Sequence, residues 1–174
     1  QREIIYEERK TVLESPDLTR HVLDMIEDVA EGTIFRYLNP DIREENRDKE
    51  ALFAALRDRF GISYDGPDTQ GDLEELKDEV MQRVRACYGE KENHLGKDLM
   101  QYLVRSVLLQ MIDSKWKEHL HSLDELREGI HLRAYGQRDP LVEYKHEAFE
   151  MFQEVTQAVK EEAVQFIFKV EAVK

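Results

Sequence analysis

The chain has 174 residues, of which 36% are charged and 41% hydrophobic, and it carries a net charge of −13 at pH 7. This acidity excludes a general binder of nucleic acid or of anionic membranes, because both need a broad basic surface. The single cysteine, Cys87, excludes an intramolecular disulfide framework and favours a reducing compartment. No apolar run approaches the length of a membrane span.

The first half of the chain predicts short and medium helices. Residues 2–14 carry apolar side chains at helical spacing among charges. Ser15 and Pro16 then predict a cap and a first helical residue for a second helix, which should run to about Tyr37. "NP" at 39–40 ends that helix, since the residue before a proline disfavours helical backbone.

The middle of the chain predicts two further helices separated by a loop. Gly61 follows the apolar stretch "ALFAALRDRF", where the C-terminus of a helix favours a left-handed residue. Residues 61–72 contain three of the eight glycines and predict a loop. Another helix is expected to start near Asp72 and to fray around 88–96.

The last third predicts an antiparallel helical hairpin. A first helix from Lys97 to about Glu128 and a second from Pro140 to about Phe168 each carry an apolar stripe, and Asp139 is placed to cap the second. The first stripe consists of Leu99, Leu103, Ile112, Trp116, Leu120, Leu123 and Ile130. The second stripe consists of Leu141, Ala148, Phe152, Val155 and Val159. Together these elements predict an all-α fold.

The residues give little support for catalysis or for a cofactor. "GPDTQGD" at 66–72 has the glycine spacing of a phosphate loop, but Asp72 stands where the motif needs lysine and would repel phosphate. No general base can be assigned to Cys87, which is therefore predicted to be a small packing residue. We therefore expect no catalytic residue and no bound nucleotide in this chain alone.

A di-iron site is the sharpest metal hypothesis. Two Glu-x-x-His pairs, Glu118 with His121 and Glu143 with His146, have the spacing that supplies ligands inside four-helix bundles. On a helical projection both pairs lie opposite the apolar stripes, so they would point away from the interior. Solvent-exposed charged pairs are the favoured interpretation, with no metal ligand assigned.

The turn "GIHLRAYGQRDP" at 129–140 is the expected hairpin tip. Its glycines allow a tight reversal, and Tyr135 stands at the apex with no core of its own to pack on. His131, Arg133 and Arg138 place positive charge on an otherwise acidic chain. A solvated turn and a contact site for a partner both fit these residues.

The chain also resembles a known family. "MIDSKWKEHLHSLDELREGIHLRAYGQRDPLVEYKHEAFEMF" at 111–152 closely resembles the two-helix finger of the SecA family, the motor ATPases of bacterial preprotein translocation. The Trp-Lys-Glu-His-Leu run, the Gly-Ile-His-Leu-Arg turn and the Asp-Pro restart occur in that order. "QREIIYEERKTVL" at 1–13 is similar to the later part of the family's long scaffold helix. Residues 41–96 match the family's wing only in position and helical character.

The resemblance implies an architecture and a set of domains. Residues 1–38 would be part of the scaffold helix, 39–96 a small helical wing, and 97–174 the finger that packs back on the scaffold. In that family ATP and Mg belong to motor domains, and the chain has neither a Walker lysine nor a DEAD-type box. We therefore expect a non-enzymatic piece of a larger translocating ATPase.

The resemblance also implies roles for residues and partners. The family's fingertip enters the cytoplasmic mouth of the SecY channel and contacts the translocating, unfolded preprotein chiefly through an aromatic apex residue, a role that falls here on Tyr135. By proximity His131, Arg133 and Arg138 become contacts of channel or substrate. Finger–scaffold packing falls on Trp116, Leu120 and Leu123.

Location and association follow from the same resemblance. It implies a cytoplasmic protein associated peripherally with the inner face of the plasma membrane and in contact with other SecA domains. Faces that other domains cover in the family would offer surfaces for self-association in the isolated chain. An unrelated helical adaptor and a di-iron bundle are the alternatives.

Overall fold

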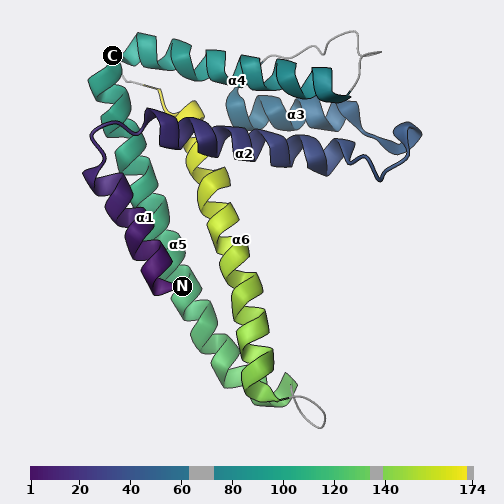
Figure 1. The fold of residues 1–174 in the computed structure, drawn as a ribbon, viewed down its shortest axis with the longest axis vertical. Helices are drawn as coiled ribbons and strands as arrows, with labels where there is room; N and C mark the ends of the chain where they lie inside the picture. The colour runs from purple at the N-terminus through teal and green to yellow at the C-terminus, as the bar shows by residue number, and fades with distance from the viewer. Residues whose placement is uncertain (63–72, 134–138, 172–174) are drawn as a thin grey trace. The chain divides into compact units, whose positions relative to one another are not determined.

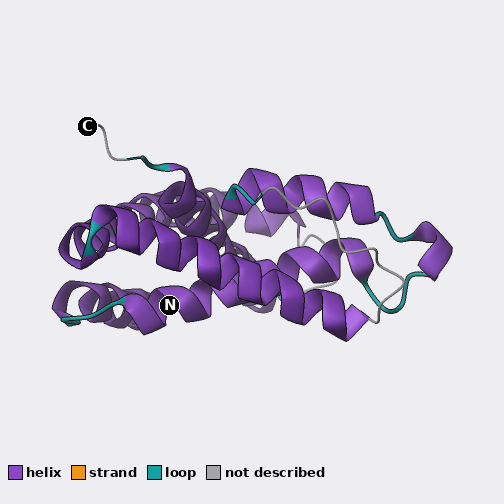
Figure 2. Cartoon of the chain, turned by 90° about the horizontal axis from the view of Figure 1, so that it is seen from above, coloured by secondary structure: helices purple, strands orange, loops and turns teal. Residues whose placement is uncertain are grey.

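The computed structural model describes residues 1–62, 73–133 and 139–171, apart from the side chain of Arg133. Within these ranges every regular element is a helix, which confirms the predicted all-α class (Figures 1 and 2). The helices are α1 (Arg2–Glu14), α2 (Thr19–Leu38), the short 3-10 helix η1 (Glu44–Asn46), α3 (Lys49–Phe60), α4 (Leu73–Leu95), α5 (Lys97–Arg133) and α6 (Pro140–Lys169). None of these described helices combines the length and apolar character needed to cross a bilayer.

Local sequence signals set several helix ends, as predicted. Pro140 is the first residue of α6, and the Asp139 carboxylate accepts a 2.9 Å hydrogen bond from the Leu141 backbone N–H. Gly61 ends α3 with a φ of 66°, and its N–H donates to the Arg57 carbonyl at 2.9 Å. This left-handed backbone suits glycine because it has no Cβ.

The predicted start of α2 is wrong. Ser15 and Pro16 do not open the helix, which begins only at Thr19. Ser15 is extended, as the residue before a proline favours. The Asp17 carboxylate accepts the Thr19 N–H at 2.9 Å, and its hydrogen bonds to Thr19 hold the pKa of Asp17 at about 2. The N-cap residue is Leu18, and the first helical N–H is bound by Asp17, the residue before it.

The predicted fraying of α4 is also wrong. The helix continues to Leu95 and stops at Gly96, which has a φ of 86°. Tyr88, inside the segment expected to fray, is buried and gives the last turns a packing contact that the local sequence does not reveal. The loop expected at 61–72 and the sequence "GPDTQGD" lie almost wholly outside the described residues.

Packing divides the chain into two compact units. The hairpin unit comprises residues 1–15 and 108–162, and the second unit comprises 16–107 and 163–174. Residues of α5 and α6 belong to both, because each helix is long enough to meet different partners at its two ends. The domains 1–38, 39–96 and 97–174 implied by the resemblance stay a prediction, since the contacts describe packing and not family boundaries.

The hairpin unit has its own core. Here α1 lies alongside α5, and α5 and α6 run antiparallel on either side of residues 134–138 (Figure 1). One side of each helix supplies its buried side chains: Ile5, Val12, Leu108, Ile112, His119, Leu126, Ile130, Ala148, Phe152 and Val159. Burial of these stripes gives helices of this length most of their stability.

The second unit packs α2 against α3 and α4 (Figure 1). Apolar residues recur along α2 at three- and four-residue steps, with Val22, Ile26 and Val29 essentially inaccessible. The end of α6 joins this core, where the rings of Phe60 and Phe168 meet edge to face at a centroid distance of 5.3 Å. The Lys91 ammonium donates to the last carbonyls of that helix, those of Ile167 and Val170.

We predict that the left-handed cap at Gly61 contributes measurably to stability. Gly61→Ala is expected to lower the free energy of unfolding by about 1 kcal/mol, because a Cβ disfavours that backbone. Gly89→Ala is the control: Gly89 lies inside α4 and a Cβ there meets nothing within 4 Å, so stability should rise by roughly 0.5–1 kcal/mol. Urea denaturation measures both, and an unchanged stability of G61A would contradict the cap.

A second prediction concerns how α1 is held. Val12 is fully buried, so Val12→Ala should lower the free energy of unfolding by about 2 kcal/mol. The Arg9–Asp113 ion pair, 2.8 Å long, is about half exposed, and Arg9→Ala should change stability little because solvent screens such pairs. Urea denaturation compares the two variants. Equal losses would show that the ion pair, and not the apolar face, holds the helix.

Candidate functional site

The hairpin carries a buried polar junction that joins three helices. His119 is only 1% exposed, and its Nε2 lies 2.9 Å from Oε1 of Gln1, at the start of α1. The Gln1 amide nitrogen in turn donates to the Ala148 carbonyl of α6 at 3.1 Å. Because a carbonyl oxygen only accepts, His119 must donate from Nε2. Its Nδ1 is then an acceptor, buried and without a hydrogen-bond partner.

Aromatic rings surround this junction. The Trp116 ring centroid lies 5.5 Å from that of His119 and 6.4 Å from that of Phe152 on α6. His119 and Phe152 are 5.7 Å apart. Trp116 is therefore half-buried in the α5–α6 seam, as its predicted place on the apolar stripe requires. Its role in packing finger against scaffold stays a prediction.

Toward the tip the buried side chains of the seam are apolar. Leu126 and Ile130 of α5 form a buried cluster with Ala148 of α6. Three partly buried side chains pack against this cluster: Leu123, Tyr144 and Met151. Leu123 thus lies where the sequence predicted, between the two helices.

Leu120 is a correction. It was expected on the buried stripe, but its side chain is 40% exposed. The buried face of α5 instead includes Ile112, His119 and Leu126, which recur every seven residues. Leu120 follows His119 by one residue and so lies about 100° further round the helix. The seven-residue spacing was the signal that the sequence analysis missed at His119.

The helix ends beside the tip expose apolar side chains that the sequence analysis also missed. Leu132 on α5 is 82% exposed, and Leu141 and Val142 in the first turn of α6 are exposed as well. Leu141 had been placed on the second stripe, but its side chain is 58% exposed. It lies seven residues, about two helical turns, before Ala148, the first buried residue of α6. Large exposed apolar groups at the ends of two helices are typical of a contact surface.

Most of the four predicted tip residues lie outside the part of the chain that the structure describes. Tyr135 and Arg138 lie in the segment 134–138, and of Arg133 only the backbone is described, as the last residue of α5. His131 is described and is exposed. Of the four, His131 is the one whose side chain the structure describes, and the contact roles of all four stay predictions.

The Glu-x-x-His pairs do not converge. Glu118, His121 and His146 are exposed. His121 pairs with Glu125 at 3.4 Å and His146 with Glu150 at 3.3 Å, each one turn along its own helix. Within the described ranges no three His, Cys, Asp or Glu side chains are grouped closely enough to hold a metal ion. Glu118, His121 and His146 thus face outward, as the helical projection predicted, whereas Glu143 is half-buried.

One cation does link the two hairpin helices. Lys115 Nζ lies 3.0 Å from Glu162 of α6 and 3.3 Å from Glu118 of its own helix. The hydrogen bond to Glu162 is the main cause that raises the pKa of Lys115, so it stays charged at neutral pH.

We predict that His119 makes the hairpin sensitive to acid. Burial lowers the pKa of His119. Near pH 6.5 the unfolded chain therefore binds a proton at this residue and the folded chain does not. Stability should therefore fall as pH drops below about 6.5, until the folded-state pKa is passed. In His119→Met that part of the pH dependence should disappear, and urea denaturation at pH 7.5, 6.5 and 5.5 measures it. A pH profile identical in the two proteins would contradict the prediction.

Comparison with known proteins identifies the family. The family described as SecA Wing and Scaffold domain matches residues 1–171. The chain is 38% identical to protein translocase subunit SecA of Halothermothrix orenii over 172 residues, which cover 98% of this chain and 20% of that protein. It is 40% identical to SecA of Heliobacterium modesticaldum, covering 99% of this chain and 21% of the relative. For SecA 1 of Thermobifida fusca the identity is 39%, with 98% and 18% covered.

These similarities extend over the segment where the sequence alone gave only a loose match. They run through residues 41–96, which had matched the wing only in position and helical character. The chain spans about a fifth of the length of these relatives. It belongs to the SecA wing and scaffold family of protein translocase subunits.

Proposed function

We propose that this chain transmits movement from the ATP-driven motor domains of a SecA translocase to a polypeptide at the mouth of the SecY channel. In this proposal ATP and Mg are bound by motor domains elsewhere in the protein, and the chain itself is not an enzyme. The whole protein works on the cytoplasmic side of the membrane, associated peripherally with the channel complex.

The observation that carries the proposal is the construction of the hairpin. Its two helices share a buried seam and are tied to α1 by Val12, by the Arg9–Asp113 pair and by the Gln1–His119 bond. Close-packed interiors resist deformation, so a displacement at the base of such a unit reaches its tip. A flexible loop of equal length would absorb the same displacement.

The tip supplies the contact in this proposal. Tyr135 would touch the translocating chain, because a tyrosine ring offers broad contact area with few rotamers to restrict. The exposed Leu132, Leu141 and Val142 at the adjoining helix ends support an apolar contact there. His131, Arg133 and Arg138 would add positive charge toward the channel or the substrate.

We predict that Tyr135 is the gripping residue. In a full-length SecA protein carrying this segment, Tyr135→Ala should reduce preprotein translocation at least about tenfold, which corresponds to roughly 1.4 kcal/mol. Tyr135→Phe should stay close to the unmodified protein, because the ring face and not the hydroxyl makes the contact. ATP turnover, measured in the same reactions, should persist in both variants.

Tyr102→Ala is the matched control for this experiment. Tyr102 is an exposed tyrosine of α5 that lies in the second unit, and its removal should leave translocation unchanged. Normal translocation by the Tyr135→Ala protein would make Tyr135 a turn residue only, and the proposed grip would be wrong.

A further inference from the structure

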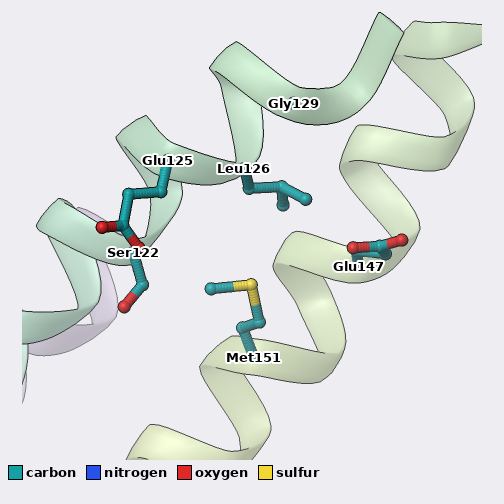
Figure 3. A pocket seen from close by; sticks show the side chains of 6 residues that line it. All are labelled: Ser122, Glu125, Leu126, Gly129, Glu147 and Met151. Atoms are coloured by element: carbon teal, nitrogen blue, oxygen red, sulfur yellow. The ribbon is translucent and has the colours of Figure 1, made fainter. Parts of the chain in front are cut away.

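A hollow lies between α5 and α6 in the hairpin unit, close to the tip. Its volume is about 310 Å³, and six residues line it: Ser122, Glu125, Leu126, Gly129, Glu147 and Met151. Figure 3 shows Leu126 and Met151 extending into the space between the helices. The carboxylate of Glu125 stands on α5 and that of Glu147 on α6, on opposite sides of these apolar side chains (Figure 3).

Gly129 leaves one part of the hollow's lining without a side chain. Gly129 lies inside α5, where glycine is disfavoured relative to alanine. A Cβ built there would meet nothing within 4 Å, so no neighbouring atom prevents a larger residue at this position. Any larger residue would extend into the space that the two carboxylates flank.

The chemistry of the lining favours a cation on an aliphatic stem. Lysine and arginine bury their methylene groups along apolar surface and keep the charged group among polar partners. Leu126 and Met151 would receive the stem, and Glu125 and Glu147 would receive the charge. Both carboxylates already have interactions, Glu125 with His121 at 3.4 Å, but a carboxylate accepts several hydrogen bonds. The net charge of −13 adds a field that attracts cations and repels anionic side chains.

We infer that this hollow binds the side chain of a lysine or arginine in the unfolded polypeptide that the hairpin contacts. The identity of the partner rests on the proposed function. Gly129 precedes the last residue of α5 by four positions, about 6 Å along the helix axis. An extended polypeptide advances about 3.3 Å per residue, so a chain held at the tip reaches the hollow about two residues further on. The hollow thus gives the hairpin a preference for basic residues beside a grip that tolerates any sequence.

The experiment is a peptide titration followed by NMR of methionine methyl groups. The full 174-residue chain carries five methionines; Met151 lines the hollow, and Met25 and Met100 are buried in the second unit as internal references. The probe is the unstructured peptide acetyl-Gly-Ser-Lys-Ser-Gly-amide, and the comparison peptide has norleucine in place of lysine. We expect saturable shifts of the Met151 signal with the lysine peptide alone, at a Kd on the order of 1 mM, because open ion pairs are weak.

Two variants with matched controls test the site. Gly129→Leu should fill the hollow and raise the Kd at least about tenfold without a loss of fold, whereas Gly89→Leu, at a similarly open helical position of α4, should leave it unchanged. Glu147→Gln should raise the Kd several-fold, and Glu154→Gln, which removes the same charge from α6 outside the hollow, should have little effect. Added salt should weaken binding of the lysine peptide.

The opposite results overturn the inference. Equal Met151 shifts with the norleucine peptide would make the hollow a merely apolar surface, and an unchanged Kd in Gly129→Leu would place the peptide elsewhere. Tyr135→Ala should leave this titration unaltered. Because the titration involves no translocation and the translocation experiment involves no hollow variant, each can fail without the other.

Discussion

The apolar seam between α5 and α6 is the constraint on which the rest of the hairpin depends. A helix of 37 residues such as α5 is about 55 Å long, and isolated helices gain little stability from propensity alone. Burial of Leu126 and Ile130 with Ala148, and of Ile112 and Phe152 further along the hairpin, supplies what propensity cannot. It also fixes the register of the two helices, which decides the residues that flank the tip and those that line the hollow beside it.

The buried polar side chain of His119 interrupts this apolar seam, and its burial costs free energy. His119 is buried with one ring nitrogen bonded to Gln1 and the other without a partner. A neutral imidazole tolerates an unpaired acceptor better than an imidazolium tolerates an unpaired buried N–H. In return the Gln1 amide reaches both His119 and the Ala148 carbonyl, so the three helices meet in one arrangement. Apolar side chains alone, which pack without direction, would permit neighbouring registers.

Acidic side chains lie on the surface and at the hollow. Exposed pairs such as His121 with Glu125 and Arg9 with Asp113 are screened by solvent and leave the fold to the core. At the hollow, the carboxylates of Glu125 and Glu147 flank the apolar side chains of Leu126 and Met151. This arrangement is the basis of the cation site inferred above.

The sequence by itself determined the helices, their approximate ends and the hairpin, because periodicity and capping are local properties: Pro140 after Asp139, and Gly61 after α3, act within one turn. The motif at 111–152 also sufficed to indicate the family. Tertiary structure decided which side of α5 is buried. The seven-residue spacing through His119 was visible in the sequence, but a stripe drawn through Trp116 differs from it by about 60°, and contact with the partner helix selects between the two. Tertiary structure likewise decided that Leu120 and Leu141 are exposed, that α4 continues past Tyr88, and that Gly129 lines a hollow together with two glutamates. These features depend on contacts between residues far apart in the chain, which no local pattern specifies.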